Sequence, residues 1–79
     1  SGSWMGGAEG EAGMVNLRTG PGTNNPVLTG VASGEEVLIL GRNQAADWLR
    51  VRAANGTLGW MSAQFVQTAL PADRYPVVE

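Results

Sequence analysis

Turn-forming residues recur about every 8–12 positions through most of this chain, and that spacing limits the fold more than any other feature. Clusters of Gly, Pro and Asn separate short apolar stretches, and no stretch with helical periodicity is long enough to form a substantial helix. The content of 12 Gly and 4 Pro points the same way, because both residues interrupt helices. The spacing predicts an all-β domain, a small barrel or sandwich of short strands.

Short apolar segments bounded by turns are the predicted strands. They are residues 14–18, 27–31, 36–42, 48–54, 57–61 and 66–68. The segment 48–54 alternates most clearly: its odd-numbered residues are apolar, whereas Trp48, Arg50 and Arg52 share the opposite face. Asn55 and Gly56 predict a type I′ hairpin directly after it.

The predicted core is small, and the barrel would have to fold without a disulfide. Its expected members are Val15, Leu17, Val27, Val31, Val37, Ile39, Val51, Trp60, Phe65 and Val66. A short 3-10 turn capped by Ser62 is expected near residues 62–65. Closing the sheet into a barrel would remove exposed strand edges.

Composition divides the chain into three zones. Residues 1–13 are rich in glycine and are expected to form a flexible lead, whose first residues resemble an expression tag. Residues 14–68 are expected to form the domain. Residues 69–79 contain proline and are expected to be a tail or linker, in which Leu70 and Tyr75 are candidates for packing back on the domain.

The absence of Cys, His and Lys excludes several kinds of functional site. Zinc, iron–sulfur and haem sites lack their usual ligands, the common nucleophile–base pairs cannot form, and the phosphate-loop lysine is missing. A net charge of −2 argues against nucleic acid as a partner. The longest aliphatic run, residues 37–40, is too short to cross a membrane. We therefore expect a binding module with no metal or cofactor, and not an enzyme.

Residues 15–22, VNLRTGPG, match a known opening motif: hydrophobic, Asn, hydrophobic, Arg, small, Gly, Pro. Further pieces follow in the same order. They are VLTGV at 27–31, EVLILG at 36–41, DWLRVR at 47–52, NGTLGWMS at 55–62 and FV at 65–66. This ordered set resembles the bacterial SH3 domain over residues 14–68. The loop of residues 43–47 departs from the pattern, because it is slightly long and rich in alanine.

The resemblance implies an SH3-like β barrel of five to seven short strands without catalytic activity of its own. Such domains usually belong to secreted or envelope proteins, often beside peptidoglycan hydrolases, so an extracellular or cell-envelope location is expected. Two roles stay open: binding of a cell-wall peptide or glycan, or packing on a neighbouring domain of the same protein. The resemblance does not extend to the proline-peptide binding of eukaryotic SH3 domains. The isolated domain is expected to be a monomer that does not insert into membranes.

The residues expected to contact a ligand lie in two loops and on the polar face of one strand. Trp48 either covers the barrel rim or offers a flat stacking surface. Asn24 and Asn25 serve turn geometry or contact a ligand, because loops on rigid barrels often carry binding function. Asp47 adds a hydrogen-bond acceptor beside Trp48, and Arg50 shares the face of Trp48.

The opening motif has mainly structural roles by the same reasoning. Arg18 either ties loop carbonyls together with its fixed guanidinium donors or clamps a ligand carboxylate, and the first role is favoured. Asn16 is expected to bond to backbone in the same loop. The other residues of the motif set are Gly20, Gly22, Gly59 and Trp60. Trp60 is expected to be a core aromatic, with Gly59 allowing a close backbone approach.

Overall fold

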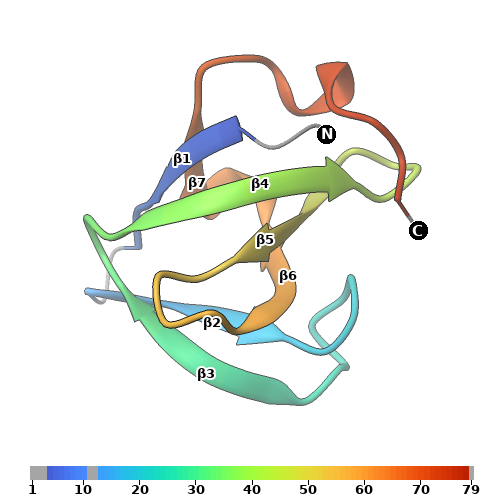
Figure 1. Cartoon of the computed structure of the whole chain (residues 1–79). Helices are drawn as coiled ribbons and strands as arrows, with labels where there is room; N and C mark the ends of the chain where they lie inside the picture. Colours follow the sequence, from blue (N-terminus) through green and yellow to red (C-terminus); the bar gives the residue numbers. More distant parts are fainter. Residues whose placement is uncertain (1–3, 11–12, 79) are drawn as a thin grey trace.

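The computed structural model describes residues 4–10 and 13–78, so the tag predicted at residues 1–3 lies outside the described residues. The chain forms a seven-stranded antiparallel sheet with the strand order β3-β2-β6-β5-β4-β1-β7 (Figure 1). The strands are β1 (Trp4–Ala8), β2 (Met14–Arg18), β3 (Val27–Ala32), β4 (Glu36–Arg42), β5 (Trp48–Arg52), β6 (Leu58–Ser62) and β7 (Val66–Thr68). Two 3-10 turns complete it, η1 (Ala63–Phe65) and η2 (Ala72–Arg74). This architecture confirms the predicted fold class.

The predicted strands agree closely with β2 to β7, but two turn details are wrong. Gly56 has a positive φ of 92°, whereas Asn55 does not, so the hairpin is not a type I′ turn. The loop is longer than expected, because it is closed by a hydrogen bond from Ala53 N to Thr57 O. Ser62 precedes η1 but makes no capping hydrogen bond with its side chain.

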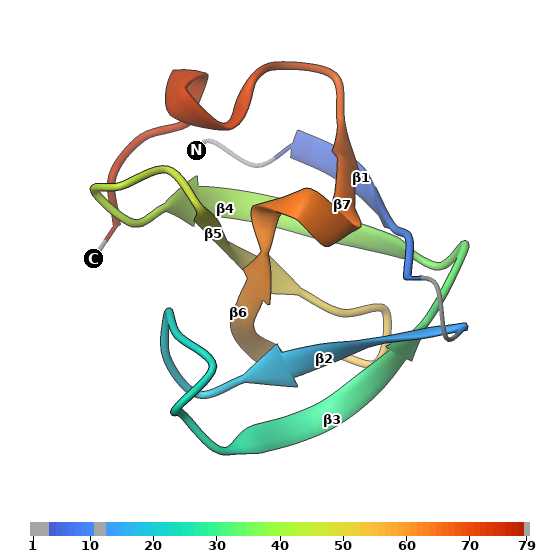
Figure 2. The same ribbon diagram turned by 180° about the vertical axis from the view of Figure 1, so that it is seen from behind.

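The sheet curves strongly, and among the described residues its two ends do not join by hydrogen bonds. Figure 2 shows β2 and β3 on one side of the molecule and β1 and β7 on the other. In the part of the chain that the structure describes, β3 pairs only with β2, and β7 pairs only with β1. The expected closure without edges is therefore wrong, and the outer side of β3 is a free edge.

The hydrophobic core lies on the inner, concave side of the sheet. Its buried members are Ala8, Val15, Leu17, Val31, Val37, Ile39, Leu49, Val51, Ala53, Met61, Val66 and Tyr75. Leu49 faces Met61 across β5 and β6, which confirms the apolar face predicted for β5. Gly59 allows β2 to approach closely, because a Cβ there would lie 2.7 Å from Leu17 Cγ. Val27 and Phe65 were wrongly assigned to the core, since they are 46% and 36% exposed.

Trp60 is buried, but it is not part of this core. The strand register places it between Arg18 of β2 and Arg50 of β5, and directly opposed residues share one face of a sheet. That face is the outer one, opposite Leu49. The guanidinium carbon of Arg50 lies 5.9 Å from the centre of the Trp60 ring, within the range of a cation–π contact. Trp60 is thus 5% exposed while packed outside the core cluster.

The glycine-rich lead differs from the expectation of a flexible segment. Residues 4–8 form β1, which pairs with both β4 and β7. Ala8 of β1 is buried in the core, and its main chain also bonds to Glu35 O and Gly34 N. Gly6 permits this close packing, because a Cβ there would lie 2.7 Å from Ile39 Cδ1. The lead joins the sheet because its alternate residues, small or apolar, face inward.

Residues 69–78, which we name the C-terminal strap, fold back on the domain where a linker was expected. Tyr75 is 1% exposed within the core, and its ring meets that of Trp4 edge to face at a centroid distance of 5.0 Å. Val77 forms a parallel bridge with Arg42, at the part of β4 that β1 does not cover. Arg42 Nε also donates to Tyr75 O at 2.8 Å. The strap therefore completes one end of the core.

Candidate binding groove

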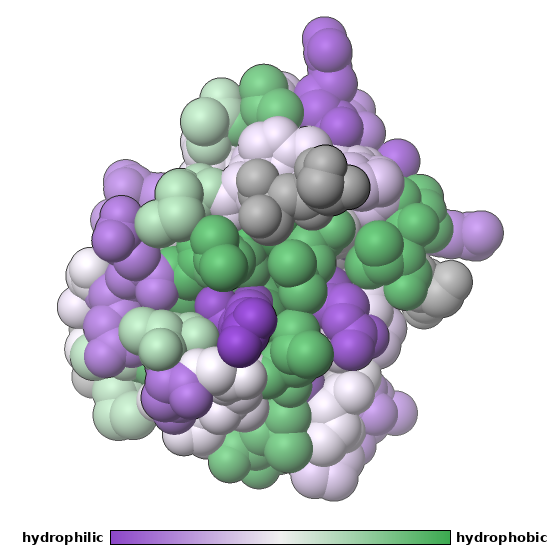
Figure 3. All heavy atoms as spheres, viewed as in Figure 1, coloured by the Kyte–Doolittle hydropathy of each residue, from purple (hydrophilic) through white to green (hydrophobic). Residues whose placement is uncertain are grey.

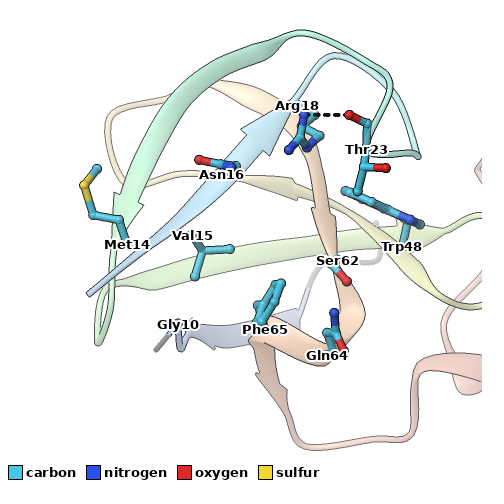
Figure 4. A pocket seen from close by; sticks show the side chains of 10 residues that line it. All are labelled: Gly10, Met14, Val15, Asn16, Arg18, Thr23, Trp48, Ser62, Gln64 and Phe65. Carbon is cyan, nitrogen blue, oxygen red and sulfur yellow. Dashed lines mark hydrogen bonds between the residues drawn. The ribbon is translucent and has the colours of Figure 1, made fainter. Parts of the chain in front are cut away.

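A hollow of about 320 Å³ opens between β2, the start of β5 and η1. Its lining residues are Gly10, Met14, Val15, Asn16, Arg18, Thr23, Trp48, Ser62, Gln64 and Phe65 (Figure 4). They come from β2, the loop after it, the start of β5, the end of β6 and η1. We call this hollow the groove. Its volume is at the lower end of the range typical of small-ligand sites.

Pairing between neighbouring strands brings the groove residues of β2, β5 and β6 close together. Trp48 begins β5 and lies directly opposite Ser62, the last residue of β6. Because η1 follows Ser62 at once, Gln64 and Phe65 are placed next to the Trp48 side of the sheet. Arg18 is the last residue of β2. It pairs with Trp60 of β6, two residues before Ser62. The groove is thus built on strand ends that the sheet holds in register.

The loop before Trp48 is organised by a buried asparagine. Asn43 Oδ1 accepts hydrogen bonds from the main-chain N–H groups of Asp47 and Trp48, at 3.2 and 3.1 Å. Asn43 Nδ2 donates to Asp47 Oδ1 at 2.8 Å. Ala46 adopts a left-handed φ of 61°, an unfavourable conformation that this network holds in place. The long, alanine-rich loop is therefore a fixed support for Trp48.

Arg18 holds in place the loop that follows β2, which contributes Thr23 to the groove lining. Its Nη1 donates to Thr23 O at 3.0 Å and to Asn25 O at 2.9 Å. Asn25 Nδ2 in turn donates to Gly22 O at 3.3 Å. Gly20 leaves room for this arrangement, because a Cβ there would lie 2.9 Å from the Asn25 side chain. These are the contacts that the structural interpretation of Arg18 requires.

The predicted ligand contacts separate into three groups. Trp48 lines the groove, and Asp47 lines an adjoining hollow that shares Thr23, Trp48, Ser62 and Gln64 with it. Asn24, Asn25 and Arg50 do not line the groove. Asn25 holds its own loop, and Arg50 covers Trp60.

Asn16 differs from its expected structural role. Its side chain is exposed and lines the groove, and it makes no hydrogen bond within residues 4–10 and 13–78. Among the groove residues that the sequence does not indicate, Phe65 resembles a core residue because it is large and apolar. Thr23, Ser62 and Gln64 carried no signal, since small polar residues are common in any loop. The one sequence feature that indicates the place of Gln64 and Phe65 beside Trp48 is the short 3-10 turn predicted directly after the strand that ends near Ser62.

The lining combines apolar and hydrogen-bonding surfaces. Met14, Val15, Trp48 and Phe65 are apolar, and Asn16, Thr23, Ser62 and Gln64 offer neutral donors and acceptors. Arg18 is the one charged residue among the described residues that line the groove. Such a surface suits a ligand with an apolar part and several polar groups, as a peptide has.

Within residues 4–10 and 13–78, no group of three or more His, Cys, Asp or Glu side chains is placed to hold a metal ion. In the same residues, no helix has the length and apolar character needed to cross a membrane.

Comparison with known proteins agrees with the fold. The sequence model of the family described as bacterial SH3 domain matches residues 13–67. Among solved structures, the chain is similar to NlpC2 from Trichomonas vaginalis, with a TM-score of 0.69 and 15% identity. The match covers 82% of this chain and 23% of the NlpC2 chain, so this chain spans less than a quarter of that protein. At this identity the similarity establishes the fold alone. A search of curated proteins found no match.

Proposed function

Because this chain belongs to the bacterial SH3 domain family, we propose that it is a non-catalytic module that recognises peptidoglycan peptide through the groove. The family consists of binding modules that are often part of cell-wall proteins. The proposed setting is therefore a larger extracellular or envelope protein, which this module would target to the wall.

The observation that carries the proposal is the position of Trp48. It is half-buried, it lies at the mouth of the groove, and Asn43 fixes the main chain that presents it. An aromatic ring held in this way offers contact area at little entropic cost, because its backbone is already ordered. The polar groups of Asn16, Ser62 and Gln64 are available for the amides of a peptide main chain.

A shallow groove of this kind supports modest affinity. A dissociation constant in the micromolar range or weaker is expected, which corresponds to a binding free energy of about −8 kcal/mol or less in magnitude. A module attached to other wall-binding or catalytic domains would gain retention through effective concentration. Weak binding by the isolated domain is therefore consistent with a targeting role.

The test is retention of the isolated chain on insoluble peptidoglycan sacculi, with Trp48→Ala compared in parallel. Wild type should be retained, and folded Trp48→Ala should lose about tenfold or more in affinity, as expected for an aromatic contact at the centre of a site. Leu58→Ala is the matched control, because Leu58 is also exposed and apolar but lies outside the groove. Equal loss in both variants would contradict a site at the groove.

A second function, packing on a neighbouring domain, is favoured by a different surface. The register places Met5, Leu38 and Leu58 in one row on the outer side of β1, β4 and β6, with Arg52 between Leu38 and Leu58. Met5 and Leu58 are exposed. Figure 3 shows hydrophobic side chains along the middle of the face that β4 crosses, with hydrophilic ones on both sides. Lack of retention on sacculi of every wall chemistry would favour this second function.

A further inference from the structure

The groove continues into a second hollow, and the two carry opposite charges. The second hollow, about 500 Å³, is lined by Glu9, Gly10, Gln64, Phe65, Val66 and Gln67. It shares Gly10, Gln64 and Phe65 with the groove, so the two form one continuous depression. Glu9 is the one charged residue among the described residues of the second hollow, as Arg18 is in the groove.

We propose that this depression binds a short peptide in one direction, with a free carboxylate at Arg18 and a free ammonium group near Glu9. The inference rests on the proposed function and adds the chemical class and orientation of the ligand. Figure 4 places Arg18 and Gly10 on opposite sides of the groove, with Val15 and Phe65 between them. Glu9 directly precedes Gly10. The apolar middle of the ligand would lie over Val15 and Phe65.

Arg18 is prepared for this contact by the bonds it already makes. Nη1 is used by Thr23 O and Asn25 O, which fixes the plane of the guanidinium group. No other N–H of Arg18 donates a hydrogen bond within residues 4–10 and 13–78, so Nε and Nη2 remain available. Arg18 is half-buried, and a partly desolvated cation interacts more strongly with a carboxylate than a fully exposed one.

Glu9 is held in position by its main chain and not by its side chain. Its N–H donates to Phe65 O at 2.8 Å, which joins the segment after β1 to η1. The carboxylate itself is exposed. Its contribution to affinity is therefore smaller than that of Arg18, because solvent screens an exposed ion pair. The pair nevertheless defines a direction, since reversing the peptide would place like charges together at both ends.

The test measures binding of the tetrapeptide Ala-Leu-Ala-D-Ala to the 15N-labelled chain by NMR titration. Four forms are compared: free at both ends, acetylated at the N-terminus, amidated at the C-terminus, and blocked at both ends. Amidation should weaken binding about tenfold, the effect of losing a charge-assisted hydrogen bond in a partly buried site. Acetylation should weaken it about twofold, as for an exposed ion pair. The shifted amides should include those of residues 18, 23 and 62–65.

Variants then assign each effect to its residue through a double-mutant cycle. The cost of amidation should vanish in Arg18→Gln, and the cost of acetylation should vanish in Glu9→Gln. Arg50→Gln and Glu36→Gln are the matched controls, because these charges lie outside the depression. Arg18→Lys is the second variant if Arg18→Gln loosens the loop, since lysine keeps the charge but loses the planar donors.

Three results would overturn the inference. Equal affinity of the wild type for the free and amidated peptides would do so without any variant. A carboxylate preference that persists in folded Arg18→Gln would also do so. Retention on sacculi without binding of the tetrapeptide would overturn the inference while leaving wall recognition intact, whereas failure of both would reject the proposed function as well.

Discussion

Two aromatic pairs occupy different regions of this small domain, and their surroundings differ sharply. Trp4 and Tyr75 meet edge to face beside the core, and Tyr75 is completely enclosed. Trp48 and Phe65 line an open groove, where both keep contact with solvent. Each pair combines a tryptophan with a residue that carries a six-membered aromatic ring, so aromatic character alone does not decide which pair is structural.

The difference comes from what covers each pair. Trp4 and Tyr75 belong to β1 and the strap, segments that lie outside the residues matched by the family model, and each segment covers the other. No described segment lies over the groove. Where β1 and the strap cover each other, the aromatic side chains stabilise the fold. In the groove, which no described segment covers, the aromatic side chains are available to a ligand.

The largest expected effect comes from removing the ring of Tyr75. Tyr75→Ala deletes a fully buried aromatic side chain and should lower the free energy of unfolding by about 3–5 kcal/mol. Urea denaturation followed by circular dichroism measures this change. Trp48→Ala is the comparison, and it should change stability by about 1 kcal/mol or less, because its ring packs at the surface. Equal losses in the two variants would contradict the distinction between the pairs.

A smaller effect is expected from displacing the strap without altering the core. A Cβ on Gly41 would lie 2.7 Å from Pro76 O and 2.5 Å from Val78 Cγ1. Gly41→Ala should therefore push the strap away and cost about 1–3 kcal/mol, as overpacking does. Hydrogen exchange checks it, because the bonds from Arg42 N to Pro76 O and from Val78 N to Arg42 O should lose protection.

Gly7→Ala is the control for this substitution. Gly7 is also a strand glycine, but no atom lies within 4 Å of the position its Cβ would take. It should leave both the stability and the exchange of the strap amides nearly unchanged. Strap protection that survives in Gly41→Ala would show that the strap contributes little to closing this end.

At the groove, the corresponding substitution is at Asn43, whose side chain supports the loop before Trp48. Asn43→Ala leaves the N–H groups of Asp47 and Trp48 without their buried acceptor and should cost about 1–2 kcal/mol. It should also weaken retention on sacculi, because the loop that presents Trp48 is no longer fixed. Asn24→Ala, in an exposed loop position, should change stability by about 0.5 kcal/mol or less. Full retention by Asn43→Ala would contradict the supporting role.

Local pattern was sufficient to predict β2 to β7 because this part of the domain is built from short apolar segments separated by turns. The face of β5 that carries Leu49 could be read directly, since a strand places alternate residues on opposite faces. The strand formed by residues 4–8 and the path of residues 69–78 could not be predicted, although Tyr75 was a candidate for packing on the domain. A glycine-rich segment and a proline-containing segment have little local preference, and their structure comes from pairing with β4 and from the contact between Trp4 and Tyr75.

Of the residues predicted as ligand contacts, Trp48 alone lines the groove, whereas Asn16 and Arg18 line it after a mainly structural role was predicted for them. An aromatic residue on the polar face of an alternating strand has a visible sequence signal, whereas Phe65 appears as one more apolar residue near the end of the domain. Trp60 on the outer face is flanked by Arg50, which lies ten positions earlier in sequence but directly across in register. Such pairings follow from register, which the sequence pattern alone did not supply.

The smallest expected effect separates the ring of Tyr75 from its hydroxyl group. The hydroxyl is buried and has no hydrogen-bond partner among the described residues. A buried polar group without a partner is destabilising, so Tyr75→Phe should keep the contact with Trp4 and raise the free energy of unfolding by up to about 1 kcal/mol. Urea denaturation beside Tyr75→Ala gives the measurement. A loss of stability in Tyr75→Phe would mean that the hydroxyl has a partner, such as a bound water, and that this end is held by a hydrogen bond as well as by packing.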